Sequence, residues 1–320
     1  MTGEAVARFS TYVATLGRGP GRSRALTRAE AADAMRVLLA GEADPIQVGA
    51  FLMLLRYRGE DAEEICGLVD AARETMRWPG LAVALDWPSY GAGRTRGAPW
   101  FLLAALALGQ SGFAVLMHGT NDFSGGMTVA QALPLLGLSP AADAASAARG
   151  LAAHGFAYAP VTALDQVFSE LLGLRRLLGL RSPMNTVARL LNPGDAAAGV
   201  DGVFHPPYIE THLAAAERMH RRRLLVLKGG GGEAERNPAK PVTAYLWDSG
   251  AGRSEVVLPA LAAAAFGLEE PDIGAIWRRQ ARDPAIEARV VATIALGLLA
   301  LGQGGDAEAQ IIWESRRAVR

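Results

Sequence analysis

The hydrophobic pattern of this 320-residue chain changes in kind near residue 78. Before that point apolar residues recur at the spacing of one helical face, as they do over residues 28–39. After it, short apolar runs at 83–86 and 114–117 enclose a longer apolar stretch at 100–108. A strand, a helix and a second strand in this order imply a parallel sheet. The sequence therefore predicts an α/β protein, with a small all-helical N-terminal domain and a larger α/β domain whose central sheet is mostly parallel.

Capping residues predict where the N-terminal helices begin. Thr27 is a favoured residue just before a helix, and Glu30 three positions later completes a capping box. Asp44 precedes a proline at the first position of the next predicted helix, where the missing N–H is not needed. A third helix is expected over residues 62–76, and Trp78-Pro-Gly ends the helical region.

Three further elements are predicted in the second half of the chain. Strands are expected at 224–227 and 242–247, the first of them after a basic helix near 208–223. Residues 290–301 are apolar on all sides, which indicates a helix buried in the core. The apolar stretch at 101–117 is broken by Gly-Gln-Ser-Gly, so we expect a helix, a turn and a strand there, and no membrane partner.

Charge and cysteine content exclude several classes of protein. Lys+Arg and Asp+Glu are equal at 32 each, so a nucleic-acid surface requires local segregation of charge. Such segregation is present between residues 171 and 228, which hold nine Lys+Arg and four Asp+Glu. A single cysteine, Cys66, cannot form an internal disulfide or a Cys-based zinc site. The N-terminus lacks a signal-peptide pattern, and we expect a cytoplasmic protein.

Five short segments match a known family in order and spacing. They are residues 26–31, 39–42 and 47–52, followed by Arg181-Ser-Pro-Met-Asn185 and Leu191-Asn-Pro193. Together they resemble the anthranilate phosphoribosyltransferase family, which is glycosyl transferase family 3. The first three look like its helical domain, and the last two fit its patterns Arg-Thr-Ile-Phe-Asn and Leu-x-Asn-Pro.

The resemblance implies a domain organisation and an assembly. A helical domain would span residues 1–78 and be joined by a helix pair near 164–190. The α/β domain would then comprise residues 79–163 and 191–320. The family uses its N-terminal helices to form dimers, so a homodimer is expected.

The segments that bind the phosphoribosyl donor in the family are altered here. Its Gly-Thr-Gly-Gly-Asp loop reads Ser-Tyr-Gly-Ala-Gly at 89–93, and its later donor ligands align with Pro-Trp-Phe-Leu at 99–102. Proline has no N–H to donate, and the other three side chains have no hydroxyl. Its Lys-His-Gly-Asn-Arg segment becomes Met-His-Gly-Thr-Asn at 117–121, and its magnesium-binding Asp-Glu pair becomes Ala234-Glu235. Because a tetraanionic donor needs these charges, we predict no cofactor and no transfer of phosphoribose to anthranilate.

The chain also resembles a subgroup of this family that lacks the transferase motifs and binds nucleic acid. That resemblance implies non-specific binding through a basic cleft, with single-stranded DNA favoured, because Tyr90 and Trp100 are placed to stack on unpaired bases. Arg175 matches the arginine with which the family holds the anthranilate carboxylate. Arginine also pairs two N–H groups with phosphate oxygens. The residues expected to bind nucleic acid or another anion are Arg18, Arg22, Arg24, Arg94, Arg96, Arg175, Arg176 and Arg181.

Other polar residues complete the expected cleft. Its candidate ligands are Ser89, Tyr90, His118 and Asn185, and His118 is included because it ends a strand of the predicted sheet. No nucleophile and base stand in a recognisable order, so no catalytic residue is predicted. The alternative is an active glycosyl or phosphoribosyl transferase with an altered donor or acceptor. Retained Arg175 and Asn185 favour it, as does Glu235, the one candidate ligand for Mg.

Overall fold

The N-terminal region is helical, as predicted, and its helix starts are capped. The computed structural model describes residues 3–19, 21–91, 96–120, 122–261 and 271–319. Its first helices are α1 (Gly3–Gly17), α2 (Arg28–Leu39), α3 (Pro45–Arg58) and α4 (Ala62–Met76). Thr27, Asp44 and Asp61 each form a capping box, which satisfies backbone donors that a helix start leaves free. The predicted starts of α2 and α3 are therefore confirmed.

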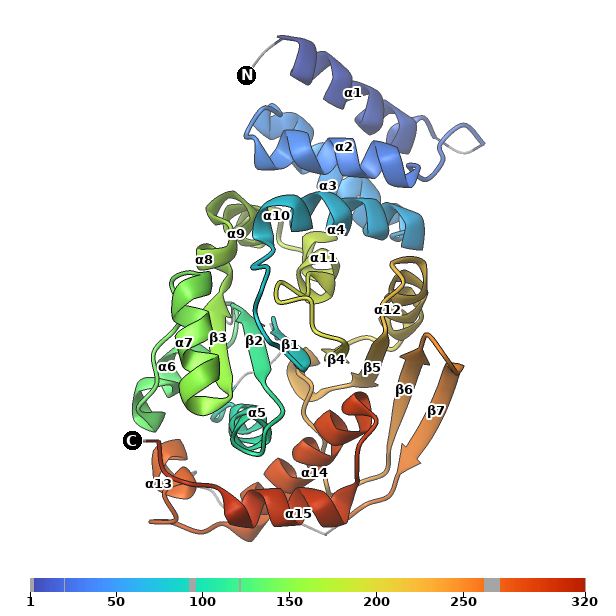
Figure 1. Ribbon diagram of the computed structural model, residues 1–320. Helices are drawn as coiled ribbons and strands as arrows, with labels where there is room; N and C mark the ends of the chain where they lie inside the picture. Colours follow the sequence, from blue (N-terminus) through green and yellow to red (C-terminus); the bar gives the residue numbers. More distant parts are fainter. Residues whose placement is uncertain (1–2, 20, 92–95, 121, 262–270, 320) are drawn as a thin grey trace.

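A seven-stranded sheet lies at the centre of the larger domain (Figure 1). The strand order is β3-β2-β1-β4-β5-β6-β7, parallel from β3 to β5 and antiparallel through β6 and β7. This confirms the predicted α/β class with a mostly parallel sheet. The strands are β1 (Leu85–Ser89), β2 (Val115–Gly119), β3 (Phe156–Pro160), β4 (Ala198–Val203), β5 (Arg223–Lys228), β6 (Val242–Asp248) and β7 (Gly252–Leu258).

Strand β1 extends further than its apolar run. The predicted strand ends at residue 86, whereas β1 continues through Pro88 to Ser89. Pro88 pairs with His118 of β2, while the pairing of β1 with β4 stops at Asp86. A proline is tolerated where a strand has no neighbour on one side, because its missing N–H then removes no ladder hydrogen bond there.

Helices cover both faces of the sheet, and each face has its own core. Leu224 and Val226 pack with the N-terminal helices, while Leu225 and Leu227 pack on the opposite face. Alternating side chains of one strand therefore reach two different cores. The remaining helices are α5 (Trp100–Gln110), α6 (Val129–Ala132), η1 (Pro134–Leu136), α7 (Ala144–His154), α8 (Val161–Leu164), α9 (Gln166–Gly173), α10 (Arg175–Leu178), α11 (Met184–Leu190), α12 (Pro207–Arg218), η2 (Gly230–Gly232), α13 (Ile273–Trp277), α14 (Pro284–Leu301) and α15 (Asp306–Ser315).

The segment from α8 to α11 leads from β3 back toward the N-terminal helices (Figure 1). Helix α11 contacts both α4 and α12, so it stands where the helical region meets the sheet. The exact division into domains stays a prediction. What matters for the site is that α3, α11 and α12 meet at one place.

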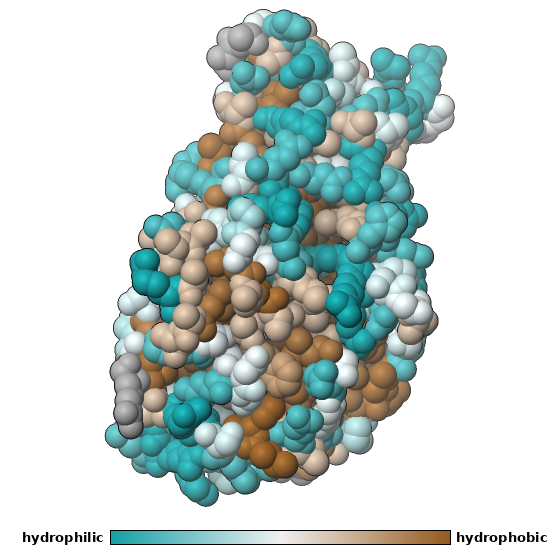
Figure 2. All heavy atoms as spheres, in the orientation of Figure 1, coloured by the Kyte–Doolittle hydropathy of each residue, from teal (hydrophilic) through white to brown (hydrophobic). Residues whose placement is uncertain are grey.

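Helix α14 is long and apolar enough to cross a membrane by length and composition. Within this fold 67% of it is buried, and it packs against α5 and the sheet. Its predicted place in the core is therefore confirmed. On the visible face, hydrophilic residues are spread over the N-terminal helices, and hydrophobic residues form patches over the larger domain (Figure 2).

Candidate functional site

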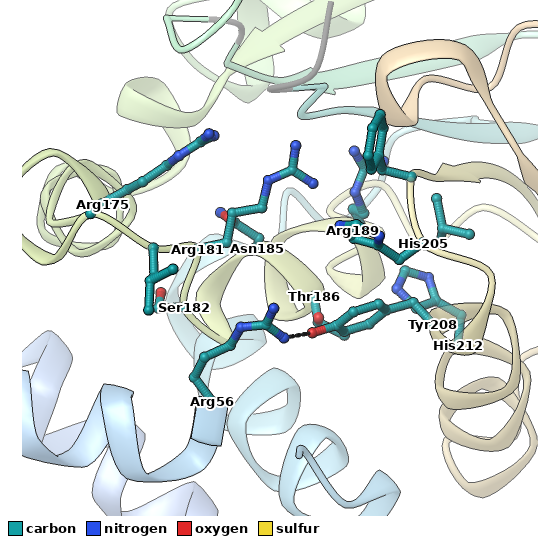
Figure 3. Close-up of a pocket in the computed structure, with 14 residues that line it drawn as sticks. Arg56, Arg175, Arg181, Ser182, Asn185, Thr186, Arg189, His205, Tyr208 and His212 are labelled. Carbon is teal, nitrogen blue, oxygen red and sulfur yellow. Dashed lines mark hydrogen bonds between the residues drawn. The ribbon is translucent and has the colours of Figure 1, made fainter. Parts of the chain in front are cut away.

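A pocket rich in arginine opens where the N-terminal helices meet the larger domain (Figure 3). Its volume is about 330 Å³. Helix α3 contributes one wall, the segment from α10 to α11 a second, and the β4–α12 connection a third. No described acidic residue lines it. We call it the arginine pocket, and its polar lining consists of Arg56, Arg175, Arg181, Ser182, Asn185, Thr186, Arg189, His205, Tyr208 and His212.

Arg56 and Tyr208 join the two sides of this pocket. Arg56, in the last turn of α3, donates a hydrogen bond to the hydroxyl of Tyr208 on α12 (Figure 3). That hydroxyl in turn donates to Glu60 over 3.4 Å. Burial, together with the nearby Glu60 carboxylate, raises the pKa of Tyr208 to about 12. The phenol therefore stays neutral at physiological pH and holds Arg56 at the pocket wall.

Arg189 is held in a buried network at the floor of the pocket. Its guanidinium donates to Asp201 at 2.8 Å and to the carbonyl oxygen of Gly232 at 2.7 Å. Asp201 also lies 2.5 Å from Nδ1 of His212. Burial favours the neutral acid, but Arg189 and His212 outweigh it and hold the pKa of Asp201 below its usual value. The charged network fixes the pocket floor.

Arg175 and Asn185 bring unsatisfied polar atoms to the pocket. Nη1 of Arg175 and Oδ1 of Asn185 are buried, and neither atom has a hydrogen-bond partner in the part of the chain that the structure describes. Arg175 and Arg176 both lie over the ring of Phe123, with guanidinium carbons 5.4 and 5.6 Å from its centre. Buried polar atoms without partners cost free energy, so this wall is suited to a polar ligand.

Arg181 lies among other cations. Burial lowers the pKa of Arg181 to about 10, with a further contribution from the charges of Arg175 and Arg189. Its guanidinium also lies 5.7 Å from the ring centre of Phe204. An anion bound between these arginines would relieve their mutual repulsion. The electrostatics of the pocket therefore favour a negatively charged ligand.

The loop after β1 presents a contrasting arrangement. Its Gly91 N–H donates to the carboxylate of Glu233 at 2.7 Å, and the Ser89 hydroxyl donates to the same oxygen at 3.2 Å. A Cβ on Gly91 would lie only 2.2 Å from that oxygen, so a side chain at this position would force the Glu233 carboxylate to shift. At the start of α5, the Phe101 N–H donates to Glu235 at 3.2 Å. Carboxylates of this chain thus occupy backbone donors that suit an external anion.

Tyr90 and His118 belong to the interior, which corrects the expectation that they face a ligand. The Tyr90 hydroxyl lies 2.9 Å from Nδ1 of His118, and Nε2 of His118 lies 3.2 Å from Asp86. Asp86 in turn lies 3.6 Å from buried Arg221. Trp100 is 2% exposed and Tyr90 is 6% exposed, so neither ring has a free face for a base. Ser89 is likewise buried against Glu233.

The predicted basic residues are only partly brought together. Arg175 and Arg181 line the arginine pocket, and Arg176 lies beside Arg175. Arg24 forms an ion pair with Glu30 at 2.6 Å. The remaining described arginines of the predicted set are exposed and lie outside the pocket lining; these are Arg18, Arg22 and Arg96. Arg94 is outside the described residues.

The residues at Glu235 do not fit a magnesium ion. One oxygen of Glu235 accepts from Arg289 at 2.8 Å and the other from the start of α5. In the described ranges, no three His, Cys, Asp or Glu side chains gather as metal ligands would.

Several residues of the site were not predicted from the sequence. Arg56, Arg189 and Tyr208 lie far apart in the chain, and among them Arg189 carried a signal as one of the nine basic residues between 171 and 228. Glu233 follows a glycine run that is more typical of a mobile loop than of a buried carboxylate. Its role depends on a contact with Gly91, 142 residues away.

Known proteins are similar to this chain in sequence. Residues 10–76 match the glycosyl transferase family helical bundle domain. Anthranilate phosphoribosyltransferase of Moorella thermoacetica is 31% identical over 273 residues, which are 83% of this chain and 78% of that protein. The enzyme of the same name from Methylobacterium sp. strain 4-46 is 31% identical over 252 residues, which are 78% of this chain and 74% of that enzyme.

Solved structures share the fold. The crystal structure of anthranilate phosphoribosyltransferase from Thermus thermophilus has a TM-score of 0.78 at 23% identity, covering 96% of this chain and 94% of that one. The Saccharomyces cerevisiae enzyme in complex with PRPP and Mg has a TM-score of 0.75 at 18% identity, covering 96% and 93%. Since the helical bundle is shared and relatives match at 31% identity along most of both chains, this chain belongs to the anthranilate phosphoribosyltransferase family.

Proposed function

We propose that this family member does not transfer phosphoribose to anthranilate and that its arginine pocket binds the phosphate backbone of nucleic acid. The pocket carries this proposal, because four arginines line it and no described acid does. Arginine pairs two N–H groups with phosphate oxygens, and such contacts do not depend on base sequence. Binding is therefore expected to be non-specific.

The filled loop after β1 supports the first half of this proposal. A phosphoribosyl pyrophosphate molecule at that loop would have to displace Glu233 from Gly91 and Glu235 from the start of α5. The Glu233 carboxylate would also repel its phosphates. Isothermal titration with phosphoribosyl pyrophosphate and magnesium tests this half, and tight, magnesium-dependent binding would overturn it.

A transferase with an altered donor or acceptor is the second candidate. Its support is that Arg175 and Asn185, which the resemblance matches to residues of the family, both line the pocket. The relatives named above are also called phosphoribosyltransferases. Turnover of any phosphoribosyl or glycosyl donor by the purified chain would favour this candidate over the first.

Salt-dependent strand binding tests the second half. Fluorescence anisotropy with a labelled single-stranded oligonucleotide should show affinity that falls steeply with salt, with a slope of roughly −0.7 per phosphate contacted. Arg175→Ala combined with Arg181→Ala should weaken all sequences alike and flatten the slope. The matched control is Arg149→Ala with Arg282→Ala, which removes the same charge from two positions outside the pocket. Strand binding that the pocket variant leaves unchanged would refute the proposal.

We further propose that the chain forms a homodimer through its N-terminal helices and acts in the cytoplasm. Two large side chains on α3 are left exposed, Ile46 at 82% and Tyr57 at 91%. A second copy packed on α3 would cover them. Sedimentation equilibrium should give a dimer mass, and Tyr57→Asp should shift the protein toward monomer.

A further inference from the structure

A second, smaller cavity lies next to the arginine pocket and is also lined by cations. Its volume is about 290 Å³, and its walls include Lys228, Lys240, Asn237 and the turn at 229–231. Among the described residues, no acid forms an ion pair with either lysine. The one acid of its lining, Glu235, is engaged with Arg289. We call it the lysine cavity.

The backbone of the glycine turn adds donors to the lysine cavity. Gly231 has φ 67° and ψ 4°, a left-handed conformation, and the φ of Gly232 is also positive, at 85°. The Gly232 and Glu233 N–H groups donate to the carbonyl oxygens of Gly229 and Gly230, so the backbone donors of this turn that can face an anion are those of Gly230 and Gly231. Together with the lysines, this turn makes the cavity suitable for a phosphate.

The two cavities are adjacent because they share a side chain. Phe204 lines both of them. It directly follows β4, and the last residue of β4, Val203, pairs with Lys228 of β5. Arg189, at the floor of the arginine pocket, bonds the Gly232 carbonyl oxygen of the glycine turn. Both cavities thus open at the carboxyl ends of neighbouring parallel strands, where α/β sheets bind ligands.

Phe204 is one of the few exposed aromatic residues in the part of the chain that the structure describes. It is 42% exposed, whereas Tyr90 and Trp100 are buried. The His205 ring packs edge-on against the Phe204 ring, with 4.8 Å between the two ring centres. The guanidinium carbon of Arg181 lies 5.7 Å from the centre of the Phe204 ring. A ring supported in this way between two cationic cavities is suited to stack on an unpaired base.

We propose that the lysine cavity is a second phosphate subsite and that Phe204 stacks on the base between the two subsites. This inference rests on the proposed function and specifies its ligand as single-stranded nucleic acid. A duplex would keep its bases paired and out of reach of Phe204. Phosphates on either side of the stacked base would lie in the arginine pocket and in the lysine cavity.

Three variants test the subsite by anisotropy with a labelled ten-nucleotide thymidine strand. Lys228→Ala with Lys240→Ala should weaken binding and make the slope of log K against log salt shallower by roughly 0.7 for each phosphate lost. Phe204→Ala should weaken binding about 5- to 100-fold without changing that slope, because it removes stacking and no charge. Phe204→Trp should restore affinity. Thermal melting checks that each variant is folded.

The controls separate this inference from the function on which it rests. An abasic strand of the same length should bind Phe204→Ala as well as it binds the parent protein, because it has no base to stack. Arg149→Ala with Arg282→Ala removes two charges elsewhere and should leave the slope unchanged. If the parent binds the strand but neither the lysine nor the Phe204 variant alters that binding, the second subsite is refuted and the proposed function stands. If the parent does not bind the strand at low salt, both the proposed function and the second subsite are refuted. If the lysine variant loses only inorganic pyrophosphate binding, the cavity is a small-anion site and the inference is overturned.

Discussion

The loop after β1 and the arginine pocket are two places where this fold offers donors to an anion, and they differ in what satisfies them. In the loop, Glu233 and Glu235 accept hydrogen bonds from backbone donors that follow β1 and begin α5. In the arginine pocket, Arg175 keeps a buried Nη1 atom that no described residue satisfies. Backbone donors in one region of this fold are therefore satisfied by the chain's own acids, while a buried arginine donor in another region is left for a ligand.

The largest effect is expected at the floor of the arginine pocket. Arg189→Met would leave Asp201 buried without its guanidinium partner and should lower the free energy of unfolding by about 3–5 kcal/mol. Urea denaturation measures it. Arg36→Ala is the control, because that arginine and Glu74 form an ion pair with both side chains about half exposed, worth about 0–1 kcal/mol. Equal losses for both variants would show that the floor is not a buried charge network.

Removing the internal carboxylate tests the filled loop directly. Glu233→Ala leaves the Gly91 N–H and the Ser89 hydroxyl without this buried acceptor and should cost about 1–3 kcal/mol. Added pyrophosphate should then raise the melting temperature of the variant by more than it raises that of the parent, since a ligand stabilises the state that binds it. Glu233→Gln keeps an acceptor oxygen and should show a smaller loss. An equal rise for the variant and the parent would mean that the loop is not an anion site even when emptied.

A smaller effect of opposite sign is expected at Arg181. Its pKa is lowered to about 10 by burial and by Arg175 and Arg189, so the charged form is disfavoured in the fold. Arg181→Met should leave the free protein equally or slightly more stable, by no more than about 0.5 kcal/mol, while weakening strand binding. Differential scanning calorimetry and anisotropy measure the two quantities. Parallel losses of stability and binding would indicate a structural role for Arg181.

The smallest effect is a change in the pH dependence of stability at Glu60. Burial raises the pKa of Glu60 above its ordinary value of 4.5, so folding favours its protonated form. Its contribution to stability is therefore present below pH 4.5 and lost as pH rises through the raised pKa. Glu60→Gln should flatten this decline and make the protein relatively more stable at neutral pH. Melting curves from about pH 4 to 7 test it, and an unchanged pH profile would contradict it.

Local signals in the sequence determined the elements that do not depend on distant partners. The caps at Thr27 and Asp44 and the all-round apolar helix α14 are read from a few neighbouring residues. The parallel sheet followed from the order of strand and helix. By contrast, β4 has the sequence Ala-Gly-Val-Asp-Gly-Val, and its glycines and Asp201 are residue types that are rare in strands. Its strand conformation depends on pairing with its neighbours β1 and β5.

Only the tertiary structure decided which polar groups face a ligand. The sequence placed Tyr90, Trp100 and His118 near the site, but whether a ring is exposed depends on what packs over it, and these are buried. The altered donor loop was visible in the sequence, but the occupation of that loop by Glu233, 142 residues away from Gly91, was not. Arg56 and Tyr208 meet across 152 residues in the same way. The composition of a short segment does not contain such distant contacts, because they form only when the helical region closes on the sheet.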